Sequence, residues 1–86
     1  MQAFSIEFLR KARKELASLP PNVQKRIAEE IEALKTNPRP PGVKILKDGE
    51  GRLRLRVGDY RVIYRVEDDR LIILVVKIGH RKNVYK

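Results

Sequence analysis

Arginines gather in one short stretch of the chain, and their spacing predicts a single cationic surface. Residues 52–57 read Arg-Leu-Arg-Leu-Arg-Val, the period-two alternation of a strand with one buried and one open face. Gly58-Asp59 then fits a two-residue type II′ turn, because that turn needs a positive φ at its first position. A second strand follows from Tyr60. A face of guanidinium groups suits an anionic ligand.

The two-residue turn also fixes which residues of the two strands lie opposite each other. The expected pairs are Val57 with Tyr60, Arg56 with Arg61, Leu55 with Val62, Arg54 with Ile63, Leu53 with Tyr64, and Arg52 with Arg65. Directly opposed side chains share a face, so the arginines lie together, with no acid on that face of the hairpin to pair with them. Like charges opposite each other destabilise a ladder, which favours ligand binding over stability as the reason for the cluster.

The chain lacks the residue types of the common hydrolytic sites. It has no cysteine and a single histidine, and its acids gather in the turn 67–69 and on the open side of a helix. These absences argue against a Ser-His-Asp triad, a zinc hydrolase and a two-metal nuclease. RNA cleavage by attack of the 2′-hydroxyl on its adjacent phosphate remains, since it needs alignment, charge stabilisation and proton transfer but no external nucleophile. We therefore expect neither a metal nor a cofactor.

Length and charge narrow the class of protein further. The 86 residues are 42% hydrophobic and 36% charged, with a formal net charge of +9, which predicts one domain over residues 1–86. A basic domain of this size often binds nucleic acid, although an acidic protein partner also fits. No apolar run reaches the roughly 18 residues of a membrane-spanning helix, and no signal peptide is recognisable. We expect a cytoplasmic protein without membrane contact.

The N-terminal half is expected to supply helices. Ala3–Glu7 alternates like a first strand, and a helix follows from Phe8 or Leu9 to about Ser18. Pro20-Pro21 ends that helix and suits the first turn of the next one, whose apolar stripe is Val23, Ile27, Ile31 and Leu34. Two helices joined by so short a turn form a hairpin.

The C-terminal half is expected to be β structure. After a proline-rich loop at Thr36–Gly42, Val43–Leu46 predicts a short strand that precedes the arginine hairpin. Leu71–Ile78 is apolar at nearly every position, so it should be central, with its second face covered by the C-terminal tail or a partner. The expected fold class is α+β: an N-terminal strand and a helical hairpin packed on one face of a small, mostly antiparallel sheet, in the order β-α-α-β-β-β.

Several motifs resemble those of the RelE/ParE superfamily of type II toxins. They are Arg52-x-Arg54, Gly58-x-Tyr60-Arg61-x-x-Tyr64, and the ending Ile78-Gly79-His80-Arg81 with Val84-Tyr85. The resemblance extends over almost the whole chain. It implies a toxin that a cognate RelB-like antitoxin neutralises. RelE-branch members cleave mRNA in the ribosomal A site, so the 70S-type ribosome and mRNA are the implied partners, whereas ParE-branch toxins poison DNA gyrase.

The resemblance to the RelE branch also implies a role for each site residue. Arg52 and Arg54 would hold and activate the substrate, and Arg61 would stabilise the transition-state phosphate. Arg81 is the candidate acid toward the leaving 5′-oxygen, and Tyr85 would stack on or orient a base. Relatives often carry lysine where Arg52 and Arg54 stand, and arginine hardly accepts a proton, so the base is left to Tyr85 or His80.

Other basic residues are expected to contact RNA around these catalytic candidates, namely Arg52, Arg56, Arg65, His80 and Lys82. The same residues also have interpretations that involve no function. The arginines fit a solvated strand face, and His80 fits a capping residue at the end of the last strand. The function classes left open are an mRNA endoribonuclease, a gyrase-inhibiting toxin and an inactive RNA-binding module.

Overall fold

The computed structural model describes residues 3–47 and 51–80, in which the strands form one mixed sheet. In chain order the strands are β1 (Ser5–Phe8), β2 (Lys44–Ile45), β3 (Arg52–Val57), β4 (Tyr60–Glu67) and β5 (Ile72–His80). Their order across the sheet is β1-β5-β4-β3-β2, with β1 parallel to β5 and the other pairs antiparallel. The expected α+β class is confirmed. Strand β5 lies inside the sheet, between β1 and β4, as expected for its apolar sequence. Strand β2 is the short strand expected at Val43–Leu46, reduced to two residues, and counting it makes the observed order β-α-α-β-β-β-β.

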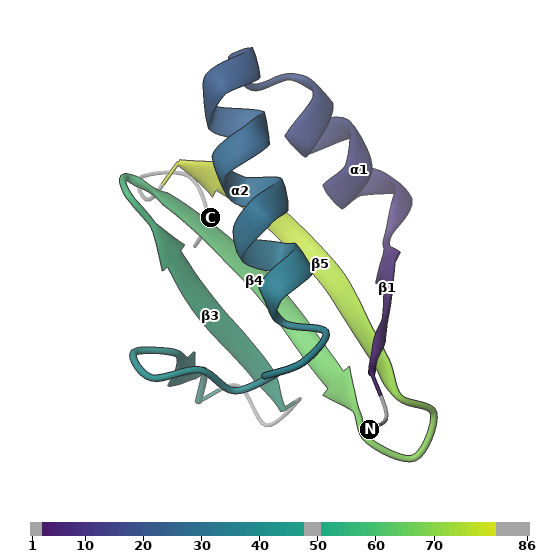
Figure 1. The fold of residues 1–86 in the computed structure, drawn as a ribbon. Coiled ribbons are helices and arrows are strands. Elements are labelled where there is room, and N and C mark those ends of the chain that lie inside the picture. The colour runs from purple at the N-terminus through teal and green to yellow at the C-terminus, as the bar shows by residue number, and fades with distance from the viewer. Residues whose placement is uncertain (1–2, 48–50, 81–86) are drawn as a thin grey trace.

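Both helices cover one face of this sheet, as Figure 1 shows. Helix α1 spans Arg10–Ala17 and helix α2 spans Pro21–Ala33, with Pro21 at the start of α2, where a proline loses no helical hydrogen bond. Ile27 and Ile31 of α2 are buried, as the apolar stripe predicted. We call the sheet face under the helices the helix-side face and the opposite one the outer face. None of the described helices is long and apolar enough to cross a membrane.

The first strand and the first helix both begin and end differently from the prediction. The strand runs to Phe8 because the next residue, Leu9, still has an extended backbone and donates its N–H to the Val75 carbonyl at 2.9 Å. This continued pairing with β5 delays the helix to Arg10. A hydrogen bond to a strand distant in sequence is invisible to local periodicity.

The β3–β4 hairpin has the predicted register at every pair from Val57–Tyr60 to Arg52–Arg65. Gly58 has a φ of 61°, as a type II′ turn requires. A Cβ atom at Gly58 would lie 3.2 Å from Nη1 of Arg26, so α2 packs close against the turn. Glycine therefore serves both the backbone conformation and the helix contact here.

A β-bulge interrupts the pairing of β4 with β5. Ile63 lies opposite Lys77 and Tyr64 lies opposite Val75, so Val76 is an extra residue on β5. Before the bulge Val75 packs in the helix-side core, and after it Ile78 does. Plain alternation from Val75 would place Lys77 on the helix side, but the bulge turns it to the outer face.

The bulged end of β5 is held from the helix layer. Strand β1 pairs with β5 only as far as Val75, and beyond that point Glu15 of α1 accepts a hydrogen bond from the Ile78 backbone N–H at 3.0 Å. A carboxylate thus replaces the missing strand partner, which fixes the backbone directly after Lys77.

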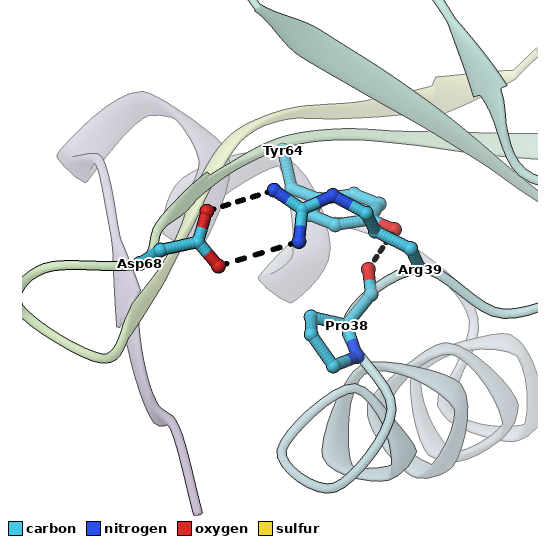
Figure 2. A network of polar contacts seen from close by, with 4 residues as sticks. All are labelled: Pro38, Arg39, Tyr64 and Asp68. Carbon is cyan, nitrogen blue, oxygen red and sulfur yellow. Dashed lines mark hydrogen bonds and ion pairs between the residues drawn. The ribbon is translucent and has the colours of Figure 1, made fainter.

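A second set of polar contacts fastens the proline-rich loop to the sheet (Figure 2). Arg39 makes two parallel hydrogen bonds to the Asp68 carboxylate, at 3.3 and 2.9 Å, and the Tyr64 hydroxyl donates to the Pro38 carbonyl at 2.7 Å. Burial raises the pKa of Tyr64 to about 12, although the nearby Arg39 charge works against that rise. Together these contacts tie the segment that leads into β2 to β4 and to the turn after it.

The buried hydrogen bond of Tyr64 gives a stability prediction. Tyr64→Phe should lower the free energy of unfolding by about 1 kcal/mol, because the Pro38 carbonyl loses its donor. The matched control is Tyr60→Phe, whose hydroxyl makes no hydrogen bond within the described residues and whose loss should change stability by less than about 0.5 kcal/mol. Urea unfolding monitored by circular dichroism measures both. Equal stabilities of parent and Tyr64→Phe would contradict the role of this bond.

The Arg39–Asp68 pair predicts a pH-dependent contribution to stability. The hydrogen bonds from Arg39 lower the pKa of Asp68 below its ordinary value of 3.8. The folded state therefore binds this proton more weakly than the unfolded chain, so the pair stabilises above pH 3.8 and this contribution is lost as pH falls through the lowered pKa. Asp68→Asn should be slightly less stable than the parent near pH 6, with the difference shrinking in acid and in high salt. A difference that stays constant down to pH 2 would contradict this linkage.

Candidate active site on the outer face of the sheet

The outer face carries the arginines in rows that run across the strands. One row is Arg56, Arg61 and Gly79, on β3, β4 and β5. The next is Lys44, Arg54, Ile63 and Lys77, on β2 to β5. The third is Arg52, Arg65, Leu74 and Glu7, on β3, β4, β5 and β1. We call the basic residues of these rows the cationic face; it brings the predicted arginines together as the sequence indicated.

Arg61 has the most unusual environment on the cationic face. Its Nε is buried and has no hydrogen-bond partner within the described residues, while its Nη1 donates to the Tyr60 carbonyl at 3.2 Å. A buried donor on a cation is costly when unpaired, so an anion placed there would satisfy it. Gly79 lies directly opposite Arg61 on β5 and has no side chain.

The remaining arginines divide by exposure. Arg52 and Arg54 are half-buried, whereas Arg56 and Arg65 are exposed. Arg56 bends back over the hairpin end, where its Nε donates to the Gly58 carbonyl at 3.2 Å. The half-buried members lie where a bound anion would be shielded from water, and the exposed ones flank them. Shielding strengthens a charge–charge contact, so the inner members offer the stronger anion contacts.

The acids at the far end of β4 from the hairpin turn are already paired with other cations. Glu67 accepts from Arg70 at 3.0 Å, and Asp68 is engaged by Arg39. Within residues 3–47 and 51–80, Arg61 and Arg65 form no ion pair. Their charge is therefore available to an external anion.

Ile63 forms an apolar floor in the middle of these cations. It is only 3% exposed although it faces away from the helices, and it does not belong to the helix-side core. Its direct neighbours in the row are Arg54 and Lys77, whose aliphatic stems can cover it while their charged ends reach outward. Ile63 is thus a buried apolar residue within a row of basic ones.

His80 lies apart from the cationic face. It is paired with Tyr60 on the helix-side face, and the two rings meet edge to face with centroids 5.6 Å apart and planes at 78°. His80 ends β5, the position for which a capping role was considered, and its expected contact with RNA stays a prediction. Three other expected site residues, Arg81, Lys82 and Tyr85, lie outside the described residues.

Two basic residues of the cationic face, Lys44 and Lys77, were not anticipated from the sequence. Lys44 is exposed beside Arg54, and Lys77 is half-buried across Ile63 from Arg54. The position of Lys44 could have been found by extending the hairpin pairing to the short strand before it. The position of Lys77 depends on the bulge, for which the sequence has no marker. In the described part of the chain no three His, Cys, Asp or Glu side chains are placed so that they could hold a metal ion together.

Proteins of known type resemble this chain over nearly its whole length. Residues 6–85 match the family model of the ParE toxin of the type II toxin–antitoxin system parDE. The RelE1 protein of Methanocaldococcus jannaschii is 41% identical to it in an alignment of 86 positions, which covers 96% of each of the two chains.

Solved structures agree with the sequence comparisons. The toxin–antitoxin complex RelBE2 of Mycobacterium tuberculosis contains a chain that superposes with a TM-score of 0.81 at 27% identity, over 92% of this chain and 99% of that one. The archaeal RelE–RelB complex of Pyrococcus horikoshii gives a TM-score of 0.81 at 29% identity, over 94% and 98%. The family match and these likenesses lead to one conclusion: the chain belongs to the RelE/ParE superfamily of type II toxin–antitoxin toxins.

Proposed function

We propose that the protein is a ribosome-dependent endoribonuclease that cleaves mRNA in the A site without a metal ion. The observation that carries the proposal is the environment of Arg61, whose buried Nε has no hydrogen-bond partner among the described residues. Arg54 and Arg56 lie on β3, the strand next to that of Arg61. A phosphodiester bound over this face would satisfy that donor. The likeness to RelE chains supports the choice of RNA as the anion.

In the proposed reaction the 2′-hydroxyl oxygen attacks the adjacent phosphorus as the P–O5′ bond breaks. The products are a 2′,3′-cyclic phosphate and a 5′-hydroxyl. Negative charge builds on the non-bridging oxygens, where Arg61 and Arg54 can each offer a planar pair of donors. Arg52, Arg56 and Arg65 would hold flanking phosphates, as Lys82 would. Arg81 is the candidate donor to the 5′-oxygen, and Tyr85 would orient a base.

The arginine forks suit this reaction because they keep their charge at any working pH and match the spacing of phosphate oxygens. They stabilise the phosphorane without themselves exchanging a proton. The reaction also needs a proton acceptor for the 2′-hydroxyl, which arginines cannot supply.

A second candidate function is inhibition of DNA gyrase, which the match to the ParE toxin model favours. In that case the same arginines would bind an acidic protein surface rather than RNA. A supercoiling assay separates the two, since a gyrase inhibitor would block supercoiling and leave programmed mRNA intact. An RNA-binding module without activity would instead bind RNA in a salt-sensitive manner and cleave nothing.

The first functional prediction concerns Arg61. Arg61→Ala should slow cleavage of mRNA on programmed ribosomes by about a hundredfold or more, because one preorganised charge is removed from the transition state. Arg70→Ala is a control of equal charge change, since Arg70 is exposed and paired with Glu67 in the turn before β5. Circular dichroism and urea unfolding confirm that both variants fold. Cleavage by Arg61→Ala at the parental rate would refute the assignment.

A further prediction concerns the antitoxin. The two similar solved structures, from Mycobacterium tuberculosis and Pyrococcus horikoshii, are toxin–antitoxin complexes. In this chain the cationic face offers a surface for an acidic amphipathic segment of a partner. We therefore expect the chain expressed alone to arrest growth, and co-expression of the protein of an adjacent short reading frame to restore it. The complex should weaken as salt rises. A chain that is harmless and monodisperse without any partner would contradict the toxin–antitoxin assignment.

A further inference from the structure

We propose that Lys77 is the general base that takes the proton from the attacking 2′-hydroxyl. The inference rests on the proposed RNA cleavage and supplies the group that this reaction lacks. It follows from the bulge in β5, which places Lys77 on the cationic face, one strand away from Arg61 on β4 and two strands away from Arg54 on β3. Bulges often re-aim a side chain next to an active site.

The register sets how close Lys77 comes to the reacting phosphate. Arg54, Ile63 and Lys77 occupy adjacent strands in one row, so the two basic residues are separated by two strand spacings, roughly 10 Å between their Cα atoms. Arginine and lysine side chains are each long enough to cross half that gap. Their ends can therefore meet above Ile63, and Arg61 stands two residues along β4 from it.

Burial and the neighbouring backbone favour the same position. Gly79, two residues after Lys77, lies opposite Arg61 and has no side chain of its own to place beside the guanidinium. Lys77 is half-buried and makes no ion pair or hydrogen bond with another described side chain. The Glu15 carboxylate holds the Ile78 N–H at 3.0 Å, so the backbone that carries Lys77 is fixed from the far side of the sheet.

The chemistry separates lysine from its arginine neighbours. A neutral lysine amine can accept a proton, whereas arginine stays charged and effectively cannot act as a base. In the proposed step the neutral amine of Lys77 takes the 2′-hydroxyl proton as the O2′–P bond forms. The P–O5′ bond breaks, its electron pair leaves with the 5′-oxygen, and that oxygen takes a proton from the general acid, for which Arg81 is the candidate. Lys77 then returns its proton to water.

The other titratable groups near this row are less suitably placed. Lys44 lies at the exposed edge on β2, beyond Arg54, and Glu7 lies on β1 in the row of Arg65. His80 packs against Tyr60 on the other face of the sheet. Among residues 3–47 and 51–80, the charged groups on the same face as Lys77 are Arg54 and Lys44 in its own row, Arg61 and Arg65 on β4, and Glu7 on β1.

The test compares Lys77→Arg with the parent in single-turnover cleavage on programmed ribosomes between pH 5 and 9. Arginine keeps the charge but cannot accept the proton, so the variant should cleave about a hundred to ten thousandfold more slowly and lose the rise of rate with pH. Its affinity for RNA should match that of the parent. Lys25→Arg, on the exposed side of α2, is the matched control and should change nothing.

Chemical rescue sharpens the test because the chain contains no cysteine. Lys77→Cys should be as slow as Lys77→Arg, and treatment with 2-bromoethylamine before the ribosomes are added should restore both the rate and its dependence on pH. The modification rebuilds a primary amine of nearly lysine length at this single position. Glu7→Gln should retain the parental pH profile.

The outcomes distinguish this inference from the proposed function. If the parent cleaves mRNA and Lys77→Arg cleaves at the same rate with the same pH profile, Lys77 is not the base although the chain is a ribonuclease. The same holds if Glu7→Gln, rather than Lys77→Arg, abolishes the rise with pH. If the parent itself does not cleave mRNA under any of these conditions, the proposed function and the role of Lys77 both fail.

Discussion

Register in the β3–β4 hairpin decides whether the arginines share a face at all, and a two-residue turn decides the register. A slip by one residue would send the alternating arginines toward the helices and the leucines outward. Gly58 prevents this, since its φ of 61° permits the short turn. Because it has no side chain, Arg26 can pack so close that Nη1 would lie 3.2 Å from a Cβ atom at this position. The cationic face is therefore a consequence of one backbone conformation at the tip of one hairpin.

The hairpin tolerates this concentration of charge because its two faces have opposite energetic roles. Opposed arginines at Arg56–Arg61 and Arg52–Arg65 oppose pairing by roughly 0.2–1 kcal/mol each. On the helix side Leu53, Val57 and Val62 are buried, and each such side chain stabilises the fold by roughly 1.5–3 kcal/mol. The stabilisation from side chains buried under the helices therefore exceeds the repulsion between the opposed arginines. The outer face is thus free to be shaped by an anion rather than by stability.

How far the sequence predicts this arrangement depends on whether the determining contact is local. The hairpin and the second helix follow from patterns within about fifteen residues, and the structure has both of them. The parallel pairing of β1 with β5 joins opposite ends of the chain, so the end of that strand at Phe8 could not be read from neighbouring residues. The bulge is harder still. Val76 looks like one more residue of an apolar run, and continued alternation from Val75 assigns Lys77 to the wrong face.

The same bulge explains how a face built from arginines could perform acid–base chemistry. Arginine gives permanent charge and matched geometry, but a site made only of arginines has no group that can take the proton from the attacking 2′-hydroxyl. Ile63 provides a dry floor, 3% exposed, on which charge interactions are stronger than in water. Lys77 reaches this floor only because one extra residue in β5 changes the phase of the strand. The strand that anchors the core thereby also places a lysine beside Ile63, where the other basic neighbour in the described part of the row, Arg54, cannot accept a proton.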